Sequence, residues 1–145
     1  MKDVAVRRAR FWYRLGAYSN FACTVPAFIV YDSYVNRFFK KSPPNYPFLV
    51  RIWSGMAFLW GVSFLEIARD PERAYPLLKY TWLEKSVTSA SVLTAFAAGA
   101  VPGSVAAGVV VTDVIWIPLF LRVHLGLSRE LDAEQKGRPA ANVES

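Results

Sequence analysis

The residues of this chain that could do chemistry are ionisable side chains inside long apolar segments. They are Asp32, Arg51, Glu66, Lys85, Asp113 and Arg122. A charge inside hydrocarbon costs several kcal/mol unless it is paired or solvated, so each is a candidate for ion pairing, ligand binding or proton transfer. The sequence has one histidine, one cysteine and no phosphate loop, nucleophile elbow or zinc-binding motif. We therefore expect no catalytic residue, no metal and no cofactor.

The composition indicates a membrane protein. Of the 145 residues, 54% are hydrophobic and 19% are charged, and the mean hydropathy is +0.24. Soluble domains are typically about 45–50% apolar and about 25% charged. The apolar residues gather into four segments at about 15–35, 48–68, 80–101 and 105–127, each about as long as a membrane-crossing helix. The sequence thus predicts an all-α integral membrane protein, a bundle of four transmembrane helices.

The positive charges predict how this bundle is oriented. Most Lys and Arg residues flank the N-terminus, the second loop and the end of the fourth segment, which places both termini in the cytoplasm and the proline-rich loop 41–47 outside. Residues 128–145 are polar and predict a flexible cytoplasmic tail. A cleaved signal peptide is the alternative for the first segment, but no small-residue cleavage pattern ends that segment. We expect a multi-pass protein of the cell (inner) membrane.

Estimated depths sort the buried charges into two layers. At 1.5 Å per residue, the outer layer holds Asp32, Arg51 and Asp113, and the inner layer holds Glu66, Glu84, Lys85 and Arg122. Asp113 and Arg51 differ in depth by only about 6 Å, so we predict that they form an ion pair between the second and fourth helices. The alternative is that Asp113 lines a cavity, where it binds a ligand or cation or relays a proton.

Aromatic and small residues predict helix packing. The aromatic candidates are Trp53, Trp60, Trp116 and Phe120, the first two in a stripe with Met56 and Phe64. Core packing is the favoured interpretation, and a pocket for a quinone, sterol or lipid tail is the alternative. Close helix contacts are expected at the small-residue pairs Ala57–Gly61 and Ser91–Ala95–Gly99.

Several short segments together resemble a known family. They are Arg51-Ile52-Trp53-Ser54-Gly55, Leu65-Glu66-Ile67-Ala68-Arg69-Asp70-Pro71, Leu83-Glu84-Lys85 and Thr112-Asp113-Val114. With them, residues 15–127 resemble the small four-helix bacterial membrane proteins of the DoxX-like type. For members with an assigned role, the resemblance implies a link to membrane oxidoreductase systems, including quinone-coupled sulfur oxidation. It implies no catalytic residue in this chain, which has no cofactor motif.

Two functions remain open from the sequence. The first is a non-catalytic subunit or accessory of a larger membrane assembly, with the lipid bilayer and other membrane subunits or further copies of the chain as partners. The alternative is a binder or carrier of a small hydrophobic molecule, or an accessory to a membrane oxidoreductase, centred on Asp113 and Arg51. Basic residues such as Arg7-Arg8-Ala9-Arg10 are expected to fix topology and to contact anionic lipid headgroups, rather than nucleic acid.

Overall fold

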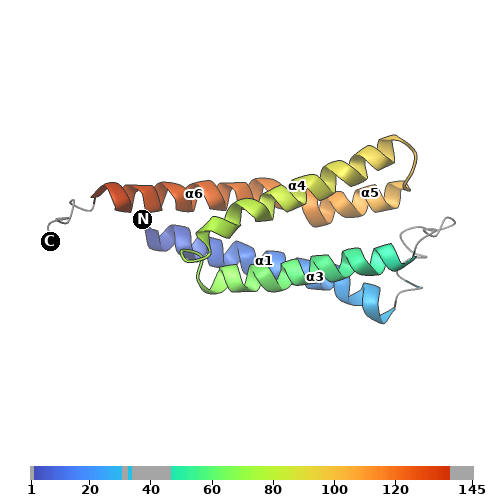
Figure 1. Ribbon diagram of the computed structural model, residues 1–145, viewed down its shortest axis with the longest axis horizontal. Coiled ribbons are helices and arrows are strands. Elements are labelled where there is room, and N and C mark those ends of the chain that lie inside the picture. Colours follow the sequence, from blue (N-terminus) through green and yellow to red (C-terminus); the bar gives the residue numbers. More distant parts are fainter. Residues whose placement is uncertain (1, 31–32, 34–46, 138–145) are drawn as a thin grey trace, which may run out of the picture.

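The computed structural model describes residues 2–30, 33 and 47–137, and none of these is in a strand. The described part is an elongated helical bundle (Figure 1). Its elements are α1 (Lys2–Ile29), α3 (Pro47–Arg69), α4 (Tyr75–Ala97), α5 (Gly103–Val109), the π-helix η1 (Val110–Val114) and α6 (Trp116–Gly137). Because α5, η1 and α6 follow one another closely, they form one long rod beside α1, α3 and α4. We call it the composite rod. The all-helical prediction is confirmed for these residues.

Two turns define the two ends of the bundle. The N-terminus of α1, the turn after α3 and the end of α6 lie at one end, and the α4–α5 turn lies at the other (Figure 1). At the first end the Lys2 ammonium is 2.6 Å from a Glu72 carboxylate oxygen and 2.7 Å from one of Glu134. Hydrogen bonds to Glu134 and Glu72 raise the pKa of Lys2 above its ordinary value. This contact joins α1 to the α3–α4 turn and to α6.

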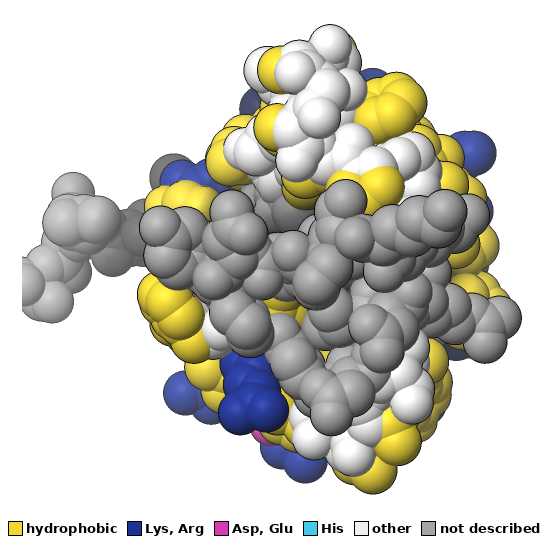
Figure 2. Space-filling view, turned by 90° about the vertical axis from the view of Figure 1, so that its right-hand side faces the viewer, with side chains coloured by type: hydrophobic (Ala, Val, Ile, Leu, Met, Phe, Trp, Pro, Cys, Tyr) yellow, Lys and Arg dark blue, Asp and Glu magenta, His cyan; other side chains and the backbone are white. Residues whose placement is uncertain are grey.

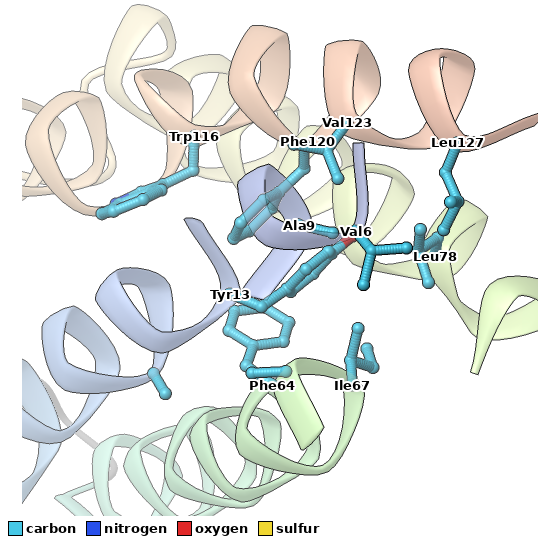
Figure 3. Packing of buried hydrophobic residues seen from close by; sticks show 12 residues of the cluster. Val6, Ala9, Tyr13, Phe64, Ile67, Leu78, Trp116, Phe120, Val123 and Leu127 are labelled. Atoms are coloured by element: carbon cyan, nitrogen blue, oxygen red, sulfur yellow. The ribbon is translucent and has the colours of Figure 1, made fainter. Parts of the chain in front are cut away.

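Aromatic side chains from three helices form the centre of the core (Figure 3). Tyr13 of α1 stacks on Phe120 of α6 with ring centroids 4.8 Å apart, and Phe64 of α3 meets both rings edge-on. The three side chains have no exposed surface. The Tyr13 hydroxyl is 2.8 Å from the Thr81 hydroxyl of α4, so its polar end is satisfied.

Two glycines allow this close packing. A Cβ atom on Gly16 would lie 2.7 Å from the Phe120 ring, and one on Gly61 would lie 2.6 Å from the Phe21 ring. Gly61 therefore forms a close contact between α3 and α1, as the Ala57–Gly61 spacing predicts. Gly16, which brings α6 against α1, was not singled out by the sequence patterns.

The structure corrects the predicted bounds at both ends of the chain. Helix α1 begins at Lys2, ahead of the predicted span 15–35, so the basic N-terminal residues lie on the same helix as the first apolar segment. Helix α6 continues to Gly137, so the prediction of a flexible tail from residue 128 is wrong up to that point. Apolar content alone marked the segments, whereas a helix can continue along polar residues that have good helix propensity. Loop residues 41–46 and the tail beyond 137 lie outside the described residues.

Gly99 has a different role from the predicted one. It follows the end of α4 with φ of +71°, the left-handed conformation that glycine adopts without strain. The Ala100 N–H donates to the Ala95 carbonyl and the Gly99 N–H donates to the Phe96 carbonyl, which is the hydrogen-bond pattern of a Schellman helix end. A Cβ at this position would have no neighbour within 4 Å. Gly99 ends the helix, and the prediction that it packs against another helix is wrong.

Two helices are long and apolar enough to cross a membrane. The candidate spans are Val50–Arg69 and Gly103–Lys136, judged by length and composition, which is weak support for a membrane location. Helix α1 carries several arginines and α4 carries Lys79, Glu84 and Lys85, which lower their apolar character. Figure 2 shows the bundle from the end with the α4–α5 turn, where hydrophobic side chains gather around the outside.

Candidate functional site: a buried ion pair between helices

The most unusual feature of the described core is an ion pair with almost no access to water. Lys85 of α4 and Asp113 of η1 lie with Nζ and Oδ1 2.5 Å apart, and each side chain is 4% exposed. Charged residues are almost never this deeply buried unless they are paired. The pair joins α4 to the composite rod near the middle of the bundle.

Asn20 extends the pair to the other two helices. Its side-chain oxygen accepts a hydrogen bond from Lys85 Nζ at 3.2 Å, and its amide donates to the Ala57 carbonyl of α3 at 3.0 Å. A continuous set of polar contacts therefore runs from η1 through α4 and α1 to α3. We call Asp113, Lys85, Asn20 and the Ala57 carbonyl the polar chain.

A second carboxylate lies beside the lysine. Glu84 Oε2 is 3.7 Å from Lys85 Nζ, and the Thr88 hydroxyl donates to Glu84 Oε1 at 3.4 Å. The side chain of Glu84 is 21% exposed, so it reaches the edge of the site, unlike Asp113. The lysine thus has one carboxylate at hydrogen-bonding distance and a second one farther away.

Helix periodicity explains why Lys85 points inward. The buried residues of α4 are Leu78, Thr81, Lys85 and Ser89, which recur every three or four positions and share one face. Lys85 therefore lies on the buried face, and its ammonium requires a partner across the core.

A change in helix winding accompanies the position of Asp113. The buried residues of the composite rod include Val109, Asp113, Trp116 and Phe120. The Ile115 N–H donates to the Val110 carbonyl at 3.3 Å, five residues back, which is the spacing of a π-helix. Such local π-turns are frequent at functional sites of α-helices. Here the turn contains the carboxylate that meets Lys85.

The predicted Arg51–Asp113 pair is wrong, because the partner of Asp113 is Lys85. The backbones of α3 and η1 do not approach each other, and Arg51 lies on an exposed part of α3. The predicted layers are also wrong for Lys85 and Asp113. The prediction puts Lys85 in the inner layer and Asp113 in the outer one, but the two side chains form an ion pair. The wrong partner arises because pairing depends on which helices are neighbours, and the wrong layers arise because α4 begins and ends earlier than the predicted segment 80–101.

The other predicted charges lie away from this site. Glu66 is 2.5 Å from Arg69, one turn along α3, with both side chains more than half exposed. Arg122 is exposed and lines a groove between α6 and α1. Asp32 lies outside the described residues. Of the predicted charges in its described part, the structure brings together Lys85, Asp113 and Glu84 at this site.

The predicted aromatic residues are divided between core and surface. Trp116 and Phe120 are packed in the core, stacked 5.5 Å apart, which agrees with core packing rather than a pocket. Trp60 is partly buried against that core, whereas Trp53 is 40% exposed. Trp60 also lines a groove of about 190 Å³ on α3 with Met56, Leu59 and Ser63. These four aromatic residues form no common pocket among the described residues.

The single histidine has a structural contact. Trp82 of α4 donates its indole N–H to His124 Nδ1 of α6 at 3.2 Å, and the Tyr75 ring lies 5.5 Å from the imidazole. This contact joins the two helices near the end of the predicted fourth span. Among the described residues, no group of three His, Cys, Asp or Glu side chains is placed to hold a metal ion.

Asn20 is the member of the polar chain that the sequence analysis missed as a site residue. The buried residues Tyr13, Gly16, Ala17, Asn20 and Thr24 share one face of α1. That spacing was a usable signal, because an amide on a buried helix face needs hydrogen-bond partners.

Chemically, the polar chain connects four helical segments through opposite charges and hydrogen bonds. The Lys85 ammonium is engaged by Asp113 and Asn20, and the Asn20 amide is engaged by the Ala57 carbonyl. This arrangement favours a structural role over a site that binds a ligand. No protein-family model, no curated protein and no solved structure matches this chain, so the DoxX-like resemblance stays a prediction.

Proposed function

We propose that this chain is a non-catalytic, multi-pass protein of the cell membrane and a subunit or accessory of a larger membrane assembly. The observation that carries the proposal is the contrast between the inside and the outside of the bundle. The deeply buried charges are paired with each other, while large hydrophobic side chains such as Leu59, Val87 and Val111 are each more than 60% exposed. Apolar side chains exposed on every helical segment suit a lipid environment.

Helix lengths support four spans. Helices α1, α3 and α4 and the composite rod each have at least 23 residues, and about twenty residues at 1.5 Å rise cross the hydrocarbon core. In lipid the polar chain would hold the four helices together, because polar groups in hydrocarbon favour contacts with one another. The start of α1 and the end of α6 lie at the same end of the bundle (Figure 1). This agrees with a topology in which both termini lie on one side of the membrane.

The α4–α5 hairpin supports an assembly role. Within the described residues, α5 contacts α4 and η1 and approaches neither α1 nor α3. The exposed positions of this hairpin include the small residues Ala90, Ser91, Ala97, Gly103 and Ala107. Small residues let the backbone of another membrane helix approach closely, and such contacts drive helix association in lipid. A partner helix, from another subunit or another copy, would find its closest approach here.

The alternative of a quinone or lipid carrier, or of an accessory to an oxidoreductase of the DoxX-like kind, has less support. Asp113 is engaged by Lys85 instead of facing a cavity. Arg51, the other predicted centre of that function, lies on α3, whose backbone is remote from η1.

Purification in a mild detergent tests the assembly role. We expect native mass spectrometry to show the 16.3 kDa chain in a larger complex. Replacing Ala107 with tryptophan should release the chain as a monomer, because the bulky ring blocks close helix approach at α5. The control is Ala22→Trp, the same change at an exposed position of α1, which should keep the complex. A wild-type chain that is monomeric in native membranes and in all mild detergents would contradict the proposal.

A further inference from the structure

A groove between α1 and α6 combines two arginines with apolar side chains. It is lined by Arg8, Trp12, Leu119, Arg122 and Val123, and its volume is about 190 Å³. Arg8 and Trp12 are one turn apart on α1, and the other three lining residues fall within two turns of α6. Both helices thus contribute one guanidinium and at least one apolar side chain.

The two guanidinium groups have no acidic partner in the described part of the chain. The ion pairs seen there involve Lys2, Arg69 and Lys85, and neither Arg8 nor Arg122 takes part in one. Both arginine residues are exposed. Two unpaired guanidiniums beside one groove attract an anion, and their planar donors match phosphate oxygens well.

Helix length places this groove at a membrane surface. Arg8 lies about 31 Å from Ile29 along α1, and Arg122 lies about 28 Å from Gly103 along the composite rod, at 1.5 Å per residue. The hydrocarbon core is about 30 Å thick, so both arginines fall at its edge when the opposite helix ends lie at the other edge. Trp12 is of the residue type enriched at such boundaries. The predicted orientation makes this the cytoplasmic side, whose lipids carry negative charge.

We propose that this groove binds the headgroup phosphate of an anionic phospholipid of the cytoplasmic leaflet. Arg8 and Arg122 donate hydrogen bonds to the phosphate oxygens, and Trp12, Leu119 and Val123 contact the glycerol and the first acyl carbons. The lipid contacts both α1 and α6 on the cytoplasmic side of the aromatic core. This inference rests on the proposed membrane location, and it adds a ligand class and a site to it.

Native mass spectrometry of the purified protein with added lipid tests the site. Phosphatidylglycerol should be retained about tenfold more than phosphatidylcholine, because each basic residue near the surface adds attraction for an anionic lipid. Arg8→Gln with Arg122→Gln should remove that preference. The matched control, Arg10→Gln with Arg14→Gln, removes the same charge from exposed positions that do not line the groove, and it should keep the preference. Equal losses in both double variants would overturn the site.

Two further arms separate the alternatives. Millimolar inorganic phosphate should leave phosphatidylglycerol bound, and its displacement by phosphate would show a site for free phosphate and overturn the lipid assignment.

The protein is taken from membranes washed with alkaline carbonate. Release of the chain by that wash would contradict the membrane proposal itself, whereas an integral chain without lipid preference contradicts only the groove. Equal melting temperatures of the two double variants verify that a loss of the preference for phosphatidylglycerol does not come from unfolding.

Discussion

Replacing Lys85 with methionine is expected to destabilise the bundle by about 3–5 kcal/mol, the cost of breaking a buried ion pair by removing one partner. The Asp113 carboxylate, with a side chain that is 4% exposed, would be left buried without its partner. The Asn20 oxygen would also lose its donor. The loss is measured as the change in unfolding free energy in detergent micelles or in a lipid bilayer.

The second partner provides the control for this prediction. Lys85→Met combined with Asp113→Leu should recover most of the loss, because replacing a buried pair by apolar residues is often neutral or stabilising. Lys79→Met removes the same charge from an exposed position of α4 and should change stability by less than about 0.5 kcal/mol. A double variant that is no more stable than Lys85→Met would show that the two residues do not form a pair.

The second large effect is expected at Gly16. Leucine at this position should cost about 3 kcal/mol, since overpacking a filled core forces side chains and backbone to move. A Cβ alone would lie 2.7 Å from the Phe120 ring and 3.3 Å from the Phe64 ring. Both rings are fully buried and held by Tyr13, so they have little freedom to move away. A lower melting temperature and weaker near-ultraviolet circular dichroism should report the loosened core.

A glycine with free space is the matched control. Gly126 lies in α6, and a Cβ there would have no neighbour within 4 Å. Gly126→Leu should leave stability unchanged or raise it by up to about 1 kcal/mol, because glycine has poor helix propensity. If Gly16→Leu proved as harmless as Gly126→Leu, the close packing of α1 against α6 would be contradicted.

The helices were predictable because hydrophobic content and length are properties of local sequence. The position of α3 agrees closely with the predicted segment 48–68. After α3, the Asp70 carboxylate accepts a hydrogen bond from the Arg73 N–H at 3.2 Å. The start of α1 and the end of α6 were missed because polar residues that continue a helix give no apolar signal. Gly99 was misread because its small size suits both a helix contact and a helix end.

The ion pair was less predictable because pairing depends on helix rotation and neighbours as well as on depth. Lys85 and Asp113 lie at similar distances from the turn between α4 and α5, when residues are counted back along α4 and forward along α5 and η1. Arg51 has a similar estimated depth, but α1 is the main neighbour of α3 and the backbones of α3 and η1 are apart. The choice between Lys85 and Arg51 therefore depended on tertiary arrangement.

Site-specific labelling from the two sides of a membrane tests the central claim, that the four helical segments span the bilayer. In a Cys23→Ala background without other cysteines, single cysteines are introduced at Ala100, in the α4–α5 turn, and at Arg73, in the turn after α3; both positions are exposed. A membrane-impermeant maleimide should label Ala100→Cys in intact cells and Arg73→Cys only after permeabilisation. Labelling of both positions from the same side would contradict the account.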